Sequence, residues 1–300
     1  MKRPNLFILG APKCGTTALT NWLSRHPNIF VPYVKEPHYF CEEYRLTASL
    51  ETYERLFLDA DAGTHRYAVD ASVWHLFSST AVENILRYSP EARFVVMVRN
   101  PLTMVPSMHG HHRYNGNELI EDLSEAWQLR GARSAGQKIG VRDGYLQPQH
   151  LAYHESCALG WQLQRLFSQV ARERVHVIVL EDIVVDANLV YTGVLDFLGL
   201  PEAHSFDLER VNAAKTRRAF WLDTLVLRLA ALKQRLGITG RLGLLAWLRR
   251  WNTKGAVRPA LTPRLQHEMA VAFRDDVALL GQLLGRDLTH WLTAELRDGA

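Results

Sequence analysis

A turn between two glycines near the start of the chain has the composition of an anion-binding loop. Gly10 and Gly15 enclose Ala-Pro-Lys-Cys, with an apolar stretch at residues 5–9 before them and a helical pattern after them. In a strand–loop–helix turn of this kind, backbone N–H groups and the helix N-terminus converge on phosphate or sulfate. The glycine spacing matches the nucleotide-binding pattern G-x-x-x-x-G-K-S/T, but Thr16 stands at the lysine position and Lys13 lies inside the loop. The pattern therefore predicts an anion site without the lysine that serves a magnesium-bound nucleotide.

A second candidate for phosphate binding lies where an apolar, β-branched stretch ends. Arg99 follows residues 93–98, and Ser107 lies about two helical turns into a segment that Pro101 opens. The carboxyl ends of parallel strands form the edge at which open α/β sheets bind ligands, so the two side chains can converge on one phosphate. In the alternative, Arg99 makes a structural ion pair and Ser107 faces solvent.

A carboxylate and an imidazole follow the first helical segment, in the stretch Lys35-Glu36-Pro37-His38. Transfer of a charged group to a hydroxyl or amine needs a base for the acceptor proton and cations for the charge on the leaving group. A carboxylate such as Glu36 can take a proton, an imidazole such as His38 can position it, and Lys35 can act as an electrostatic helper. In the alternative, Glu36 pairs with Lys35 at the surface and His38 is a packing residue.

Together these motifs resemble those of sulfotransferases that use 3′-phosphoadenosine 5′-phosphosulfate (PAPS), most of all the heparan-sulfate type and its bacterial relatives. The resemblance implies that Lys13 contacts the phosphosulfate bridge and that Arg99 and Ser107 bind the 3′-phosphate. It also implies that Glu36 is the general base and that His38 positions the acceptor or Glu36. The residues that it assigns to the 5′-phosphosulfate loop are Pro12, Lys13, Cys14, Gly15, Thr16 and Thr17.

The resemblance further implies the reaction and its co-substrate. A sulfuryl group would pass in line from PAPS to a hydroxyl or amine of a glycan, lipid or small natural product, leaving adenosine 3′,5′-bisphosphate, with no metal required. Two other functions stay open. One is a P-loop kinase for a small molecule, which Thr16 disfavours, and the other is a non-catalytic nucleotide-binding adaptor at a membrane surface.

The chain departs from some heparan-sulfate enzymes after the second expected strand. Those enzymes carry a lysine in a Glu-Lys-(Ser/Thr) stretch, and the comparable residues here are Asp70-Ala71-Ser72. We therefore expect Lys13 and Lys35 to supply the positive charge. Asp70 either faces the acceptor or caps the segment that follows.

Apolar strands alternate with helical patterns along most of the chain, which is typical of a parallel sheet covered by helices on both faces. We expect a P-loop-like three-layer α/β/α fold with a central parallel sheet and a helical, basic C-terminal part. The expected strands are residues 5–9, 67–69, 93–98 and 175–180, and the expected helices are residues 16–25, 80–88, 151–172, 187–198 and 263–284. No linker is visible, so we predict one domain over residues 1–300, with its α/β core at 5–200 and the helical part at 201–300.

Positive charge is concentrated late in the chain. Residues 215–258 contain eleven Lys or Arg and one acid, whereas the rest of the chain has a net charge of −6. By a loose likeness to the family, Lys215 and Arg217 would cover the bisphosphate product. In the alternative, they are the basic residues that flank the N-terminus of a helix. Leu, Trp and basic residues in 221–251 indicate either a helix on an anionic membrane surface or a core-facing helix with a basic solvent side. Nucleic acid is not an expected partner, because the basic block is rich in Leu and Trp.

The composition, 47% hydrophobic and 22% charged, excludes a disordered or collagen-like chain. The apolar runs are shorter than the ~18–20 residues of a membrane span, no secretory signal is visible, and three cysteines cannot form a disulfide framework. We expect a cytoplasmic protein, peripheral at the inner membrane surface if 221–251 binds lipid. The histidines at 109–112 and at 150 and 154 lack a zinc-ligand pattern, so we expect no metal site, and those at 109–112 either line the acceptor site or face solvent.

Overall fold

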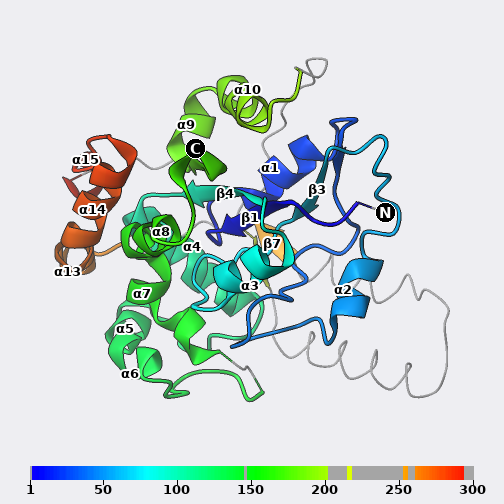
Figure 1. Ribbon diagram of the computed structural model, residues 1–300. Coiled ribbons are helices and arrows are strands. Elements are labelled where there is room, and N and C mark those ends of the chain that lie inside the picture. The colour runs from blue at the N-terminus through cyan, green and yellow to red at the C-terminus, as the bar shows by residue number, and fades with distance from the viewer. Residues whose placement is uncertain (1, 145–146, 202–214, 218–252, 256–260, 294–300) are drawn as a thin grey trace, which may run out of the picture.

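The computed structural model describes residues 2–144, 147–201, 215–217, 253–255 and 261–293. Its centre is a five-stranded parallel sheet with the strand order β2-β3-β1-β4-β5 (Figure 1). The strands are β1 (Leu6–Gly10), β2 (Ile29–Phe30), β3 (Tyr67–Asp70), β4 (Arg93–Val98) and β5 (Val175–Val179). The expected central parallel sheet is confirmed, and β2 is a strand that the sequence pattern did not indicate.

The middle strands are buried, which explains why they could be recognised. Every residue of β1 is buried, and β4 is buried from Phe94 to its end. Ile8 of β1 pairs with Val95 of β4, and Phe94 pairs with Val175 of β5. A parallel strand that is covered on both faces consists of an almost continuous apolar run, and both segments have that composition.

Helices lie on both sides of the sheet and complete the three layers (Figure 1). The helices up to residue 198 are α1 (Thr16–Leu23), α2 (Leu50–Arg55), α3 (Ala81–Tyr88), α4 (Pro101–Tyr114), α5 (Leu123–Gln128), α6 (Arg130–Ser134), α7 (Tyr153–Cys157), α8 (Leu159–Phe167), α9 (Leu180–Val185) and α10 (Ala187–Leu198). The helices nearest the C-terminus are α13 (Pro263–Ala272), α14 (Arg274–Leu284) and α15 (His290–Thr293).

Two segments that were expected to form single long helices are each divided. The expected helix at 151–172 is α7 followed by α8, because Ala158 leaves the helical conformation between them (φ −80°, ψ 81°). The carboxylate of Asp276, on α14, accepts hydrogen bonds from the N–H groups of Gly160 and Trp161 at 3.1 and 2.9 Å. This distant carboxylate caps the start of α8, a contribution that local sequence does not reveal. The expected helix at 263–284 breaks at Phe273, between α13 and α14.

The C-terminal part combines helices with a short antiparallel pair. β6 (Lys215–Arg217) pairs with β7 (Thr253–Gly255), with Thr216 opposite Lys254. The side-chain amide of Asn100 donates to the Trp291 carbonyl at 3.2 Å, which ties α15 to the start of α4. The 221–251 segment expected to face either a membrane or the core lies outside the described residues, so its membrane contact stays a prediction.

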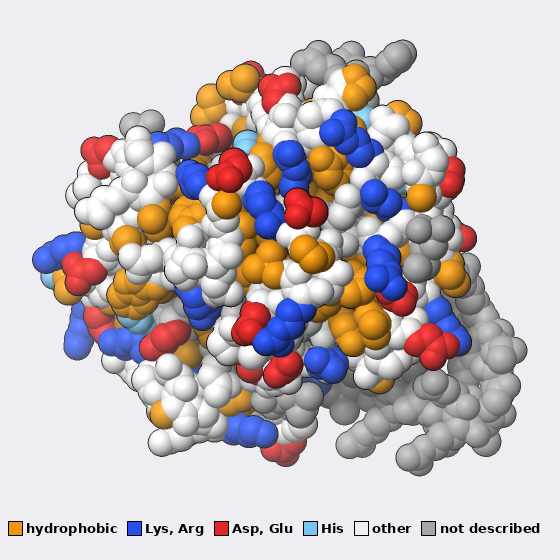
Figure 2. Space-filling view, in the orientation of Figure 1, with side chains coloured by type: hydrophobic (Ala, Val, Ile, Leu, Met, Phe, Trp, Pro, Cys, Tyr) orange, Lys and Arg blue, Asp and Glu red, His pale blue; other side chains and the backbone are white. Residues whose placement is uncertain are grey.

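On the face drawn in Figure 2, Lys and Arg side chains are interspersed with Asp and Glu side chains. None of the helices in the described ranges is both long and apolar enough to cross a bilayer.

Candidate active site

The loop predicted to bind an anion joins β1 to α1, with Gly10 ending the strand and Gly15 preceding the helix. The N–H group of Ala11 donates to the Met97 carbonyl at 2.8 Å, which fixes the loop to β4. Gly15 has a φ of +91°, and a Cβ there would lie 2.9 Å from a side chain of α9. A Cβ on Gly10 would lie 2.2 Å from the Val73 carbonyl oxygen. Both glycines are therefore needed for the backbone to follow this path.

The loop offers backbone groups and one lysine to a ligand. The first N–H groups of a helix have no carbonyl one turn earlier to accept from them, so those of Thr16 and Thr17 can serve an anion, whereas the Ala18 N–H donates to the Gly15 carbonyl at 2.9 Å. Lys13 is partly exposed, with a φ of +64°, whereas Cys14 is buried with its Sγ atom 3.8 Å from Met104 Sδ. Burial raises the pKa of the Cys14 thiol above its ordinary range, so this side chain packs beneath the loop as a neutral group.

Arg99 and Ser107 lie where the sequence placed them, at the end of β4 and on α4. The Arg99 guanidinium donates from Nη1 to the Lys13 carbonyl at 2.9 Å and from Nε to Thr103 Oγ1 at 2.8 Å. Arg99 therefore links the loop to the first turn of α4. The Ser107 side chain is buried, and its hydroxyl has no hydrogen-bond partner in the described part of the chain. A buried hydroxyl without a partner costs about 1–3 kcal/mol, so this position favours a ligand that accepts a hydrogen bond.

Lys35, Glu36 and His38 form a contiguous group against the start of α1. Lys35 Nζ lies 2.6 Å from Thr17 Oγ1 and 3.1 Å from Glu36 Oε1. His38 Nε2 lies 3.5 Å from the other carboxylate oxygen, Glu36 Oε2. Burial raises the pKa of Glu36, but the hydrogen bond from His38 and the charge of Lys35 outweigh it, so the net pKa lies below its ordinary range. Glu36 is thus ionised at neutral pH and can accept a proton.

The backbone of this group is held in an unusual conformation. Glu36 and His38 have φ values of +60° and +45°, in the left-handed region that non-glycine residues rarely adopt. The His38 N–H donates to Ser72 Oγ at 3.0 Å, and Ser72 in turn donates to Asp70 Oδ1 at 2.6 Å. Tyr53 donates to Asp70 Oδ2 at 2.8 Å. Asp70 is fully buried, and both of its carboxylate oxygens accept hydrogen bonds from these side chains.

His111 belongs to the same region, although the sequence gave no role to it in particular. The residue is more exposed than His109 and His112, which are buried on the same helix. Partial desolvation lowers the pKa of His111 to about 4, and the positive charge of nearby Lys13 acts in the same direction. His111 is therefore a neutral hydrogen-bonding group beside the loop lysine at pH 7.

Lys215 and Arg217, the residues expected to cover the bisphosphate, lie on the strand β6. The backbone of Lys215 and Arg217 forms β6, which contacts α4, the helix that carries Ser107 and His111. Their side chains lie outside the described residues, so their expected contact with the bisphosphate stays a prediction.

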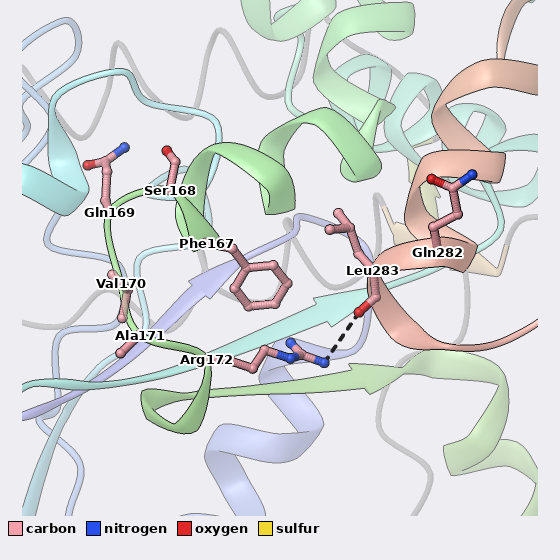
Figure 3. Close-up of a pocket in the computed structure, with 8 residues that line it drawn as sticks. All are labelled: Phe167, Ser168, Gln169, Val170, Ala171, Arg172, Gln282 and Leu283. Carbon is pink, nitrogen blue, oxygen red and sulfur yellow. Dashed lines mark hydrogen bonds between the residues drawn. The ribbon is translucent and has the colours of Figure 1, made fainter.

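A pocket of about 540 Å³ lies elsewhere, between the end of α8 and α14 (Figure 3). Arg172 lies over the Phe167 ring at 4.3 Å and donates to the Leu283 carbonyl at 3.5 Å. No residue of the loop or of the Lys35–Glu36–His38 group lines this pocket, which separates it from the candidate site.

Comparisons with known proteins bear on the family. A family model described as "Sulfotransferase domain" matches residues 3–219. Human "Carbohydrate sulfotransferase 15" is 25% identical over 172 residues, which cover 42% of this chain and 31% of the human protein, and the mouse protein is 26% identical over the same shares. The chain thus matches less than a third of the length of these relatives. A sulfotransferase from Alicyclobacillus acidocaldarius has the same fold, with a TM-score of 0.70 at 24% identity, over 97% of this chain and 99% of that one.

Proposed function

The chain belongs to the sulfotransferase domain family, and from this premise we propose that it transfers a sulfuryl group from PAPS to an acceptor hydroxyl or amine. The observation that carries the proposal is the contact between two predicted motifs. Lys35 reaches Thr17 in the first turn of α1 and Glu36 in its own loop, so a base and a cation lie directly against the helix that follows the anion loop.

The arrangement of the donor groups supports PAPS as the co-substrate. In this proposal the loop amides and Lys13 hold the 5′-phosphosulfate, and Arg99 with Ser107 holds the 3′-phosphate. Within the described residues the buried Ser107 hydroxyl has no hydrogen-bond partner, which favours an oxygen-rich ligand beside α4. Arg99 donates to the Lys13 carbonyl, so the residues that would hold the two phosphate groups are in direct contact. The 3′-phosphate is the group that distinguishes PAPS from ATP, so Arg99 and Ser107 would set the preference for the donor.

The catalytic roles follow from charge and position. Glu36 is ionised and is held in position by His38. It takes the proton from the substrate hydroxyl or amine while the oxygen or nitrogen of that group attacks sulfur. The bond from sulfur to the bridging oxygen breaks, and its electron pair stays on that oxygen, which leaves as part of adenosine 3′,5′-bisphosphate. Lys13 and Lys35 stabilise this developing negative charge.

A carbohydrate is the acceptor that the observations favour over a lipid or a small natural product. The human and mouse relatives are named carbohydrate sulfotransferases. Tyr33 is 99% exposed and lies two residues before Lys35, so its ring is available to pack against an acceptor. His111 offers a neutral hydrogen-bonding group for hydroxyls near Lys13.

The test is transfer from PAPS to a panel of oligosaccharides, hydroxylated lipids and phenols, followed by mass spectrometry of the sulfated product. We expect turnover on an oligosaccharide, and Glu36→Gln should lower kcat by about 100-fold or more while the affinity for adenosine 3′,5′-bisphosphate is unchanged. Glu51→Gln is the matched control, because Glu51 is a surface carboxylate paired with Arg55. Full activity of Glu36→Gln would overturn the role of the base, and phosphorylation of an acceptor by Mg-ATP would favour a kinase.

A further inference from the structure

A buried group of metal-ligating side chains lies directly behind the candidate base. Ligand atoms of His38, Cys41 and His75 all lie within 4.8 Å of one another. These residues are 3%, 0% and 0% exposed, in that order. The geometry points to a cation site, and we propose that His38 Nδ1, Cys41 Sγ and one ring nitrogen of His75 bind a single Zn²⁺ ion.

The first argument is the number of unsatisfied nitrogen atoms. His38 Nδ1 and both ring nitrogens of His75 are buried and have no hydrogen-bond partner within the described ranges. Buried polar atoms are nearly always paired, and each one that is not costs about 1–3 kcal/mol. A cation bound by one nitrogen of each ring would provide partners for two of these three atoms.

The second argument is the chemistry and spacing of the ligand set. One thiolate and two imidazoles suit Zn²⁺, with Zn–S near 2.3 Å and Zn–N near 2.0–2.1 Å. Such bonds place tetrahedral ligand atoms about 3.4–3.6 Å apart. Because the ligand atoms lie within 4.8 Å of one another, each pair would close by no more than about 1.4 Å. Binding replaces the proton on Cys41 Sγ, and that proton leaves to solvent. Three protein ligands are one fewer than a closed structural zinc site has, so a fourth coordination position stays open.

The third argument comes from the groups around the ligands. His38 turns its other nitrogen, Nε2, toward Glu36 Oε2 at 3.5 Å. Its backbone N–H bonds to Ser72, which itself bonds to the buried Asp70 carboxylate. Metal-bound histidines commonly have a carboxylate on the second ring nitrogen, because it fixes the tautomer and the ring orientation.

The packing around His75 is apolar and aromatic. Its ring centre lies 5.9 Å from that of His38 and 6.0 Å from that of Phe40, both edge to face. Such an apolar shell strengthens the attraction between a cation and its thiolate.

A cation at this site has a consequence for Glu36 that rests on the proposed function. With Zn²⁺ on Nδ1, the His38 proton must sit on Nε2, so this nitrogen always donates to the Glu36 carboxylate. The metal would then act as a positioning group for the base and would not touch the sulfuryl group. Its removal should lower kcat by roughly tenfold and leave the affinity for adenosine 3′,5′-bisphosphate unchanged.

The site itself is tested on the full-length protein, stripped with a chelator under reducing conditions and titrated with Co²⁺. We expect one equivalent to bind, with a thiolate-to-cobalt charge-transfer band that one equivalent of Zn²⁺ abolishes. Cys41→Ser should remove the band and His75→Gln should weaken binding at least tenfold. Cys157→Ser, at another buried free cysteine, is the matched control and should keep the band.

Two results would overturn the site. One is the absence of the charge-transfer band in the stripped wild-type protein, which needs no variant to fold. The other is a band that survives Cys41→Ser and disappears in Cys157→Ser. Neither readout depends on sulfuryl transfer, so a protein that binds metal without turnover would refute the proposed function alone, and turnover without metal binding would refute the site alone.

Discussion

Replacing Lys35 with methionine tests whether its charge sets the protonation of the base. Lys35 Nζ lies 3.1 Å from Glu36 Oε1, and the two side chains are 32% and 33% exposed. Ion pairs this accessible to solvent are worth about 0.5–1 kcal/mol, which corresponds to roughly 0.4–0.7 of a pH unit in the pKa of Glu36. The sign follows from the charge, because losing a nearby cation destabilises the carboxylate and raises its pKa.

The assay is the pH dependence of kcat/KM for sulfuryl transfer. Glu36 must be ionised to accept a proton, so activity is present above its pKa in the folded protein and is lost as the pH falls through that value. In Lys35→Met we expect the acid limb of the profile to move to higher pH by about 0.4–0.7 units. Arg55→Met is the control, because Arg55 pairs with Glu51 on the surface and should leave the limb in place. The reasoning would be refuted if the acid limb of the Lys35→Met profile stays at the wild-type pH or moves to lower pH.

Two predictions concern stability. Ser72→Ala removes the acceptor for the His38 N–H and a donor to the buried Asp70. Urea unfolding should show a free energy of unfolding that is lower by about 1–3 kcal/mol. A decrease below ~0.5 kcal/mol would contradict the role given to Ser72. Arg133→Met breaks a fully buried ion pair with Glu118, whose atoms lie 2.7 Å apart, and should cost about 3–5 kcal/mol in the same assay. Arg55→Met serves as its surface control and should change the free energy of unfolding by no more than ~0.5 kcal/mol.

The parts of the fold that could be predicted are those in which local composition decides the structure. β1 and β4 are short apolar runs that are almost fully buried, and β5 is a partly buried run that is mostly β-branched. The glycine-bounded loop must follow a strand and precede a helix. The division of the 151–172 segment could not be foreseen, because the carboxylate that caps α8 comes from Asp276, more than 110 residues away. The two-residue strand β2 is too short to leave a pattern.

The candidate site shows the same limit. The residue types were visible in the sequence, but the positive φ values at Glu36 and His38 are supported from a distance by Ser72 and Asp70. Because these contacts fix the backbone at His38, the His38 ring lies beside both Glu36 and His75. The Cys41 and His75 positions gave no metal signal because they are 34 residues apart and match no short zinc spacing.

The most direct test of the central claim is a calorimetric titration of the protein with adenosine 3′,5′-bisphosphate, compared with ATP plus Mg²⁺, on the wild type and on Arg99→Ala. We predict that the bisphosphate binds at least tenfold more tightly than Mg-ATP. Arg99→Ala should weaken bisphosphate binding by about 10- to 150-fold, because hydrogen bonds to charged groups are worth about 1.5–3 kcal/mol. Preference for Mg-ATP, or equal bisphosphate affinity in Arg99→Ala and the wild type, would contradict the account.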